Sequence, residues 1–312
     1  MNGDYQIVPL ANGENTLFSA RYGEKLHPGL GPSAEAELLY VRQLNIRERL
    51  AAQRGEFVIW DVGLGAAANA LAVLRATREI SGQLRLVSFD NTSEPLAFAL
   101  KNAAALGYVA GYEPQMAALL QEQRTEFKNG KLQVRWEFQL GDFPALLARP
   151  SAVAPLRRVD RSPTRLVGKT VPVHAGSNLV APDAIFFDAF SPAKNPGMWT
   201  LPVFEHLHRA LDPARPCALT TYSRSTMIRA TLLLAGWFVG VGHATGRKEE
   251  TTIAANSLDL ISEPLDARWL ERAARSDSAE PLREPVYSRA PIAPGTLAAL
   301  QRQPQFISSF PH

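Results

Sequence analysis

Phe57-Val-Ile-Trp-Asp-Val-Gly-Leu-Gly65 is the stretch that decides the fold of this chain. Its first six residues form a short apolar run, which is typical of a strand covered on both faces of a sheet. Two glycines follow at once, and an alanine-rich stretch from Ala66 to about Ile80 then predicts a helix. A strand, a glycine turn and a helix in this order indicate the first unit of a parallel α/β sheet, with a ligand at the turn.

Strands and helices alternate outward from this unit. After strand 57–62, further strands are predicted at residues 84–90, 132–138, 184–188, 217–222, 237–242 and 251–258. Helices are predicted at 34–52 with Ser33 as N-cap, and at 95–106, 114–127, 202–211, 225–235 and 268–274. The last two strands reverse direction around Gly246-Arg-Lys248. We therefore predict a Rossmann-like, seven-stranded, mostly parallel sheet that ends in an antiparallel hairpin.

The composition is that of an ordinary globular protein. Hydrophobic residues make up 46% of the 312 residues and charged residues 20%, and the net charge is +3, so the whole molecule is not a polybasic binder. The single cysteine, Cys217, excludes an internal disulfide framework and a Cys-rich zinc site. No His/Cys/Asp cluster has metal-ligand spacing, so no metal is expected. The sequence shows neither a signal peptide nor a membrane span, and we expect a cytoplasmic protein.

Composition also divides the chain. Residues 1–55 are predicted to form short strands and a helix that pack over the active site, and 56–262 to form the main domain. Residues 149–180 are rich in arginine and proline without helical periodicity, so we expect a basic insertion there. Residues 263–312 are polar and proline-rich, and we expect a C-terminal tail.

Acidic residues end three successive predicted strands and predict a nucleotide-like ligand. Gly63 and Gly65 let the backbone approach this ligand closely. Asp90 can accept both hydroxyls of a ribose, and Asp142 can receive an adenine amino group. Asp61 stands two residues before the first glycine, where it can face an amino group of the ligand through water. These glycines and acids, together with the closing hairpin, favour S-adenosyl-L-methionine as cofactor and a class I methyltransferase fold.

Two alternatives remain for this end of the sheet. Gly63, Gly65 and Ala68 formally satisfy the G-x-G-x-x-[G/A] pattern of dinucleotide-binding proteins. The substantial segment before the strand and the position of Asp61 count against a nicotinamide or flavin site. The plainer alternative is that the glycines only make a tight turn and the acids only cap helices.

The block Asp188-Ala-Phe-Ser-Pro-Ala-Lys-Asn-Pro-Gly-Met-Trp199 follows the fourth predicted strand. That strand adjoins the first across the switch point of the sheet, so the block is expected to face the transferred methyl group. Asp188 is predicted to accept a hydrogen bond from an acceptor amine, because such a displacement depends mainly on alignment and desolvation. Phe190 and Trp199 offer aromatic faces to a planar base, and Lys194 is assigned to substrate binding with them. The alternative is a proline-rich turn anchored by Trp199.

The sequence resembles the methyltransferase part of the MnmC-type tRNA 5-methylaminomethyl-2-thiouridine enzymes. The resemblance rests on Asp188–Trp199, on Gly246-Arg-Lys-Glu249, and on Gly23-Glu-Lys-Leu-His-Pro-Gly-Leu-Gly31 followed by Glu35-Ala36, and it covers roughly residues 5–260. It implies methylation of the primary amine of 5-aminomethyl(-2-thio)uridine at the tRNA wobble position. Asp188 would then contact the amine, and Arg247 and Lys248 would lie near the substrate as phosphate contacts. The cofactor would be held by Gly63, Gly65, Asp90 and Asp142.

The chain departs from this family in two ways. The glycine loop reads Gly-Leu-Gly-Ala-Ala-Ala-Asn, where the family more often has Gly-x-Gly-Thr-Gly-Leu-Asn. The chain has no room for the flavin-dependent oxidase domain of the bifunctional form, so we expect a separate enzyme to supply the aminomethyl intermediate. His27 is interpreted as a lid contact over the active site or as a structural residue.

Two other functions compete with this one. One keeps the fold and transfers a different group to a small-molecule amine, including aminopropyl transfer. The other is a non-catalytic nucleotide- or tRNA-binding protein, in which the altered glycine loop has lost the cofactor.

Overall fold

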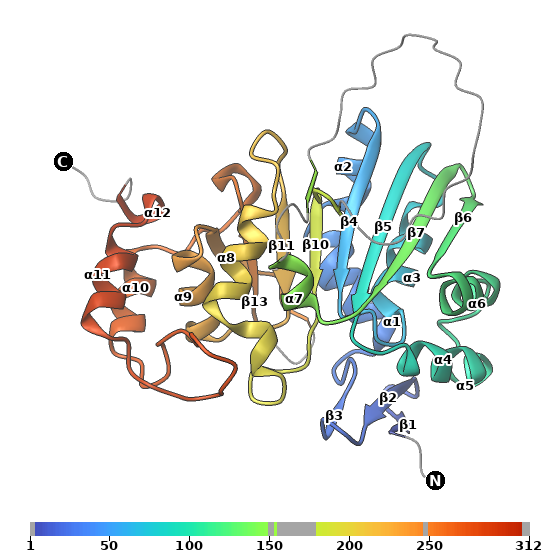
Figure 1. Ribbon diagram of the computed structural model, residues 1–312, viewed down its shortest axis with the longest axis horizontal. Coiled ribbons are helices and arrows are strands. Elements are labelled where there is room, and N and C mark those ends of the chain that lie inside the picture. The colour runs from blue at the N-terminus through green and yellow to red at the C-terminus, as the bar shows by residue number, and fades with distance from the viewer. Residues whose placement is uncertain (1–3, 149–152, 155–178, 246–248, 308–312) are drawn as a thin grey trace.

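The computed structural model describes residues 4–148, 153–154, 179–245 and 249–307, and its centre is one eight-stranded sheet (Figure 1). The strand order is β12-β13-β11-β10-β4-β5-β7-β6. These strands are β4 Glu56–Val62, β5 Gly82–Asp90, β6 Arg124–Asn129, β7 Leu132–Leu140, β10 Ala184–Phe187, β11 Ala218–Thr221, β12 Phe238–Gly242 and β13 Thr251–Ala255.

The direction of the strands confirms the predicted fold class, although the sheet has eight strands instead of the predicted seven because β6 is added at its edge. The five central strands β7, β5, β4, β10 and β11 run parallel to one another. β13 inserts antiparallel between β11 and β12, which gives the predicted closing hairpin. The chain order changes direction between β4 and β10, and ligands of such sheets bind at the carboxyl ends of the strands at this switch point.

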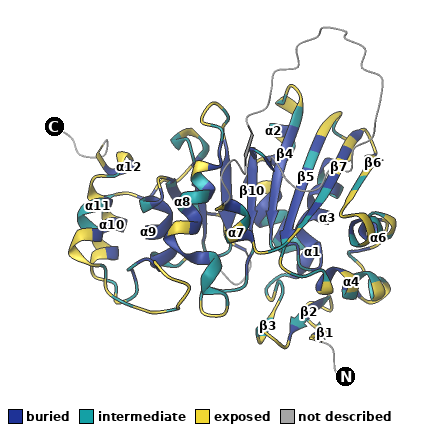
Figure 2. Ribbon diagram, viewed as in Figure 1, coloured by how far each residue is buried: buried dark blue, intermediate teal, exposed yellow. Residues whose placement is uncertain are grey.

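Strand β4 shows why the sheet is buried on both faces (Figure 2). Phe57 and Ile59 belong to one hydrophobic cluster, and Val58, Trp60 and Val62 belong to the other. Since neighbouring residues of a strand point to opposite faces, a continuous apolar run is what a sheet between two helical layers requires.

Helices cover each face. One layer holds α1 Pro32–Ala36, the π-helix η1 Glu37–Arg42, α2 Ile46–Ala52, α3 Ala68–Thr77, α4 Glu94–Lys101, α5 Ala103–Leu106 and α6 Glu113–Glu122. The other layer holds α7 Phe143–Leu147, the 3-10 helix η2 Pro196–Trp199, α8 Leu201–Arg209, α9 Thr226–Leu234, α10 Ala267–Ala274, α11 Pro294–Gln301 and α12 Pro304–Ile307.

The N-terminal segment corrects one predicted helix. β1 Tyr5–Pro9, β2 Asn15–Ser19 and β3 Glu24–Lys25 form a small antiparallel sheet, as the short predicted strands indicated. The helix predicted at 34–52 is broken instead at Asn45, whose φ of 49° is left-handed. Ser33 lies inside α1 and does not cap it, because Gly31 holds the N-cap position.

The prediction of a helix through residues 114–127 was wrong in its second half. α6 ends at Glu122, and β6 follows as an antiparallel edge strand paired with β7. The side chains of β6 alternate between exposed and covered. The dipeptide Asn129-Gly130 at the end of β6 is a strong hairpin signal that should have outweighed the helical pattern before it.

The C-terminal segment carries more structure than the predicted patch at 268–274. α10 matches this patch, but α11 and α12 were missed, and all three pack into the second hydrophobic cluster. Trp269 and Phe306 stack, and the buried Gln305 amide donates hydrogen bonds to the backbone oxygens of Val239 and Leu265. These contacts fix the segment at the β12 end of the sheet, far from α4–α6 (Figure 1).

The predicted lack of a membrane span and the basic insertion can be compared only with the described residues. Among the described residues, no helix is long and apolar enough to cross a membrane. Of the basic insertion 149–180, only β8 Val153–Ala154 and β9 Leu179–Val180 are described, and they pair in parallel. The rest of the insertion lies outside the described residues.

Candidate active site

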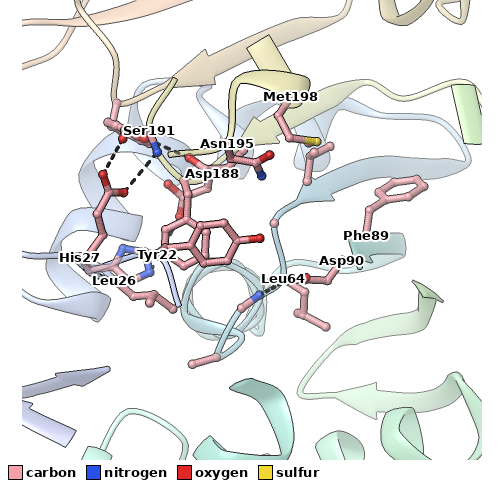
Figure 3. Close-up of a pocket in the computed structure, with 18 of the residues that line it drawn as sticks. Tyr22, Leu26, His27, Leu64, Phe89, Asp90, Asp188, Ser191, Asn195 and Met198 are labelled. Carbon is pink, nitrogen blue, oxygen red and sulfur yellow. Dashed lines mark hydrogen bonds and ion pairs between the residues drawn. The ribbon is translucent and has the colours of Figure 1, made fainter. Parts of the chain in front are cut away.

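A cavity of about 520 Å³ opens at the carboxyl ends of the central strands (Figure 3). This volume is within the usual range for small-molecule sites. The walls come from segments far apart in the chain: residues from 22–29, 35–40, 62–66, 89–92, 141–144 and 188–198, with Tyr222 and Thr245.

The glycine turn forms the floor of the cavity. The amides of Gly63 and Leu64 both donate to the backbone oxygen of Phe89, and the Gly65 amide donates to the Asp90 carboxylate at 2.9 Å. Gly63 has a φ of 97°, and a Cβ there would lie 2.7 Å from the backbone oxygen of Asp188. A side chain at this position would therefore collide with the acceptor block.

Asp90 has acceptor capacity left for a ligand. One oxygen accepts the Gly65 amide and the other accepts the Thr92 amide at 3.3 Å. Burial raises the pKa of Asp90, and these backbone hydrogen bonds oppose the rise. A carboxylate has about four acceptor positions, so capacity remains for a ribose hydroxyl.

Asp61 was predicted to contact the cofactor, but it does not line the cavity. It is fully buried and accepts a hydrogen bond from Ser88, which in turn accepts one from Trp136. Burial raises the pKa of Asp61 to about 8, so the group is mainly protonated at neutral pH. Its carboxyl group joins β4, β5 and β7 beneath the glycine turn, and the sequence pattern alone did not distinguish this position from a ligand contact.

Asp142 lies at the opposite rim. It is exposed, lines the cavity, and caps α7 by accepting the Ala145 amide at 3.0 Å. Asp142 is predicted to receive an adenine amino group. The helix cap leaves oxygen lone pairs free for this hydrogen bond.

Asp188 stands on the wall that faces the glycine turn. Its side chain is 17% exposed, and it accepts a hydrogen bond from Asn69 at 2.8 Å. Burial, and next the Asp188 charge, raise the pKa of Tyr40 and of Tyr222 well above the usual value, so both phenols stay protonated beside it. The Asp188 carboxylate thus stands at the cavity surface beside two neutral phenols.

The three other predicted residues of the acceptor block occupy different places. Phe190 lines the cavity and stacks on Tyr22, with ring centroids 4.0 Å apart. The prediction that Trp199 binds a base was wrong, because Trp199 is fully buried and donates a hydrogen bond to the Phe190 backbone. Lys194 is exposed and is not among the residues of the cavity wall.

Residues 22–29 form a lid over the cavity, within the segment 1–55 that the sequence predicts to pack over the active site. Glu24 accepts hydrogen bonds from the Ser191 amide and hydroxyl, and Leu26 lies against Gly65. Tyr22 covers one face of Phe190. The Gly23–Gly31 block marked this segment in the sequence. Only the fold shows that the block contacts both the acceptor block and the glycine turn.

The two predicted phosphate contacts, Arg247 and Lys248, lie outside the described residues. Thr245, just before them, lines the cavity beside the lid. Among the residues that the structure describes, no group of three or more His, Cys, Asp or Glu side chains is placed to hold a metal ion.

Known proteins resemble this chain in sequence and in fold. Residues 171–257 match the family model of an S-adenosyl-L-methionine-dependent methyltransferase. The chain is 29% identical over 286 residues to the tRNA 5-methylaminomethyl-2-thiouridine biosynthesis bifunctional protein MnmC of Cupriavidus necator, covering 85% of this chain and 37% of that protein. The MnmC of Ralstonia nicotianae is 29% identical over 250 residues, covering 78% and 33%. The chain therefore spans about a third of the length of these relatives.

A solved structure shares the fold. The crystal structure of MNMC2 from Aquifex aeolicus superposes with a TM-score of 0.62 at 22% identity, over 95% of this chain and 84% of that one.

The sheet order, the glycine turn and the family match define the chain as a class I methyltransferase that uses S-adenosyl-L-methionine. Over most of its length the chain is similar in sequence to the methyltransferase part of the MnmC proteins. The donor set fits this cofactor: an open glycine turn, a carboxylate with free acceptor positions and a second acid at the far rim, with Gly63, Gly65, Asp90 and Asp142 as the residues that would hold it.

Proposed function

We propose that the chain N-methylates 5-aminomethyl(-2-thio)uridine at the wobble position of tRNA. The observation that carries this proposal is the contact between the Gly63 turn and Asp188, where the structure leaves no room for a Cβ. It places the backbone of Asp188, whose side chain lies on the acceptor side of the cavity, beside the cofactor turn. Similarity to tRNA 5-methylaminomethyl-2-thiouridine biosynthesis proteins supports this nucleoside, and a carboxylate at the cavity surface supports an amine as the acceptor group.

The cofactor supplies the methyl group, whose bond to sulfur breaks as the amine nitrogen bonds to the methyl carbon. The chain's own residues bind and orient. Asp188 holds the amine by a hydrogen bond, and Asn69 fixes the carboxylate that does so. The lid excludes water, which strengthens these polar contacts and keeps the reactants aligned.

The substrate and its supply follow from the same proposal. An anticodon nucleotide turned out of its stack is the form that enters a cavity of this size. Phe190 offers it an aromatic edge, and we assign Lys194, Arg247 and Lys248 to phosphate contacts at the rim. A separate enzyme supplies the free amine, and the reaction takes place in the cytoplasm.

A thermal-shift series tests the cofactor. S-adenosyl-L-methionine is expected to raise the Tm, because a ligand that binds only the folded state stabilises it. Decarboxylated S-adenosyl-L-methionine and NADH serve as the comparison ligands. Stabilisation by NADH alone would contradict a methyltransferase, and preference for the decarboxylated compound would favour aminopropyl transfer.

Nucleoside analysis tests the acceptor. In cells lacking the protein, the methylaminomethyl nucleoside is expected to disappear from tRNA and its aminomethyl precursor to accumulate. An unchanged level of the methylated nucleoside would remove the tRNA assignment while leaving the methyltransferase class intact.

A further inference from the structure

Asp188, His27 and Glu35 are neighbours in the cavity wall (Figure 3 labels the first two). The Nε2 atom of His27 is 3.9 Å from Oδ2 of Asp188, and its Nδ1 atom is 3.8 Å from Oε2 of Glu35. These separations are longer than hydrogen bonds, and such contacts in ligand-free sites tighten when the reactants bind. The imidazole thus stands between two carboxylates.

Both carboxylates are fixed by neutral donors. The Oε1 atom of Glu35 accepts the amides of Gly29 and Leu30, which leaves Oε2 directed to the imidazole. Asn69 donates to Oδ2 of Asp188, the same oxygen that faces the imidazole. His27 itself has a left-handed φ of 54°, a conformation that costs a non-glycine residue energy and is found at functional sites.

The reaction needs a proton acceptor in addition to the carboxylate that orients the amine. A primary alkylamine resembles the lysine side chain, with a pKa of about 10, and is mainly protonated at pH 7. An ordinary aspartate has a pKa of about 3.9 and an imidazole about 6.5, and the most efficient acceptor is the one nearer the working pH. Before the methyl group is transferred, the amine must therefore lose a proton, for which an imidazole is in general a better acceptor than a carboxylate.

We propose that His27 takes this proton through Asp188, and that Glu35 positions His27. The N–H bond of the substrate ammonium breaks, its electron pair stays on nitrogen as the nucleophilic lone pair, and the proton passes by way of the Asp188 carboxylate to Nε2 of His27. The imidazolium then lies between two negative charges. His27 is a positioning and proton-accepting residue that acts through Asp188, and this role rests on the proposed function.

The surroundings suit this role. The side chain of His27 is only 12% exposed, so water competes weakly for the proton. The titratable and charged groups around the pair come from several elements: Glu24 and Lys25 of β3, Glu35 of α1, Tyr40 of η1, Asp61 of β4, Asp90 of β5, and Tyr222 after β11.

The pH dependence of His27→Gln tests the proposal. With tRNA carrying the aminomethyl nucleoside, kcat at pH 7 is expected to fall by about 100-fold, the lower range for a lost acid–base group. The loss should shrink towards pH 9.5, because the amine then gives its proton to solvent. The Kd for S-adenosyl-L-methionine should stay within about threefold. An unchanged kcat, or an equal loss at every pH, would overturn the role.

Two further variants keep the test decisive if the glutamine variant folds poorly. His27→Gly suits the left-handed backbone and leaves a space in which added imidazole should restore activity in proportion to its concentration. Glu35→Gln keeps an oxygen for the two backbone amides, and its kcat should fall about 10-fold, again mainly at low pH. Absence of rescue together with a normal Glu35→Gln profile would refute the proposal.

His206→Gln on α8, outside the cavity wall, is the matched control and should match the wild type at every pH. The wild type separates the two proposals. If it methylates the aminomethyl tRNA while His27→Gln is equally active, only the role of His27 falls. If the wild type itself does not act on this tRNA, the proposed function falls, and the role of His27 falls with it.

Discussion

The two ends of the cavity are built in different ways. The cofactor end consists of the glycine turn and Asp90, which follow two adjacent parallel strands and are joined by backbone hydrogen bonds. The acceptor end combines Asp188 with the lid residues 22–29, Glu35 of α1 and Asn69 of α3. The first end is assembled by local strand connections, and the second only by the packing of distant segments. The two ends should therefore respond differently to substitution.

The largest effect is expected at the acceptor end, for Asp188→Asn. Losing the charge that orients the amine in a water-excluded site should lower kcat by roughly 1,000-fold, while cofactor affinity changes little. Single-turnover methylation with calorimetric measurement of cofactor binding checks both values. Full activity of the variant would contradict the role of Asp188 and place the amine elsewhere.

The opposite pattern is expected at the cofactor end, for Asp90→Asn. Weakening the charged acceptor for a ribose hydroxyl should raise the Kd for S-adenosyl-L-methionine by about 10- to 100-fold, since hydrogen bonds to charged groups contribute roughly 1.5–3 kcal/mol. At saturating cofactor, the KM for the acceptor should remain that of the wild type. If the acceptor KM rose instead, the division between the two ends would be wrong.

Gly63 is where the two ends touch, so Gly63→Ala should affect both. The added Cβ meets the Asp188 backbone and the φ of 97° adds strain, so we expect a loss of about 2 kcal/mol in the free energy of unfolding, and weaker binding of both ligands.

Gly55→Ala, at the other end of β4, is the matched control for Gly63→Ala. Its φ is also positive, at 110°, but a Cβ there meets no atom within 4 Å. Denaturant unfolding of the two variants separates collision from backbone strain, and equal losses would show that the contact with Asp188 contributes nothing.

The smallest effect concerns the altered glycine loop. Ala67 stands where the resembled family more often has glycine, and its φ of 64° is left-handed. Ala67→Gly should remove this strain and stabilise the protein by about 1 kcal/mol, with cofactor affinity nearly unchanged. A melting curve measures the gain, and a lower Tm would show that Ala67 contributes packing that outweighs its strain.

The sequence predicted the fold because its signals are local. The apolar run of β4, the two glycines and the acids at the strand ends each act within a few residues. Local patterns gave the wrong prediction for β6, because the helical pattern before it continued into this hairpin strand. They also missed α11 and α12. Those elements are stabilised by burial against distant partners, which no short window contains.

For the site, the sequence by itself determined which residue types are present and which strand ends carry them, including Gly63, Gly65, Asp90 and Asp188. Only the tertiary structure decided how they are used. It buried Asp61 and Trp199 behind the cavity wall and brought His27 to within 4 Å of Asp188. The reason is physical: the turn conformation depends on neighbouring residues, whereas burial and proximity depend on how segments more than a hundred residues apart pack together.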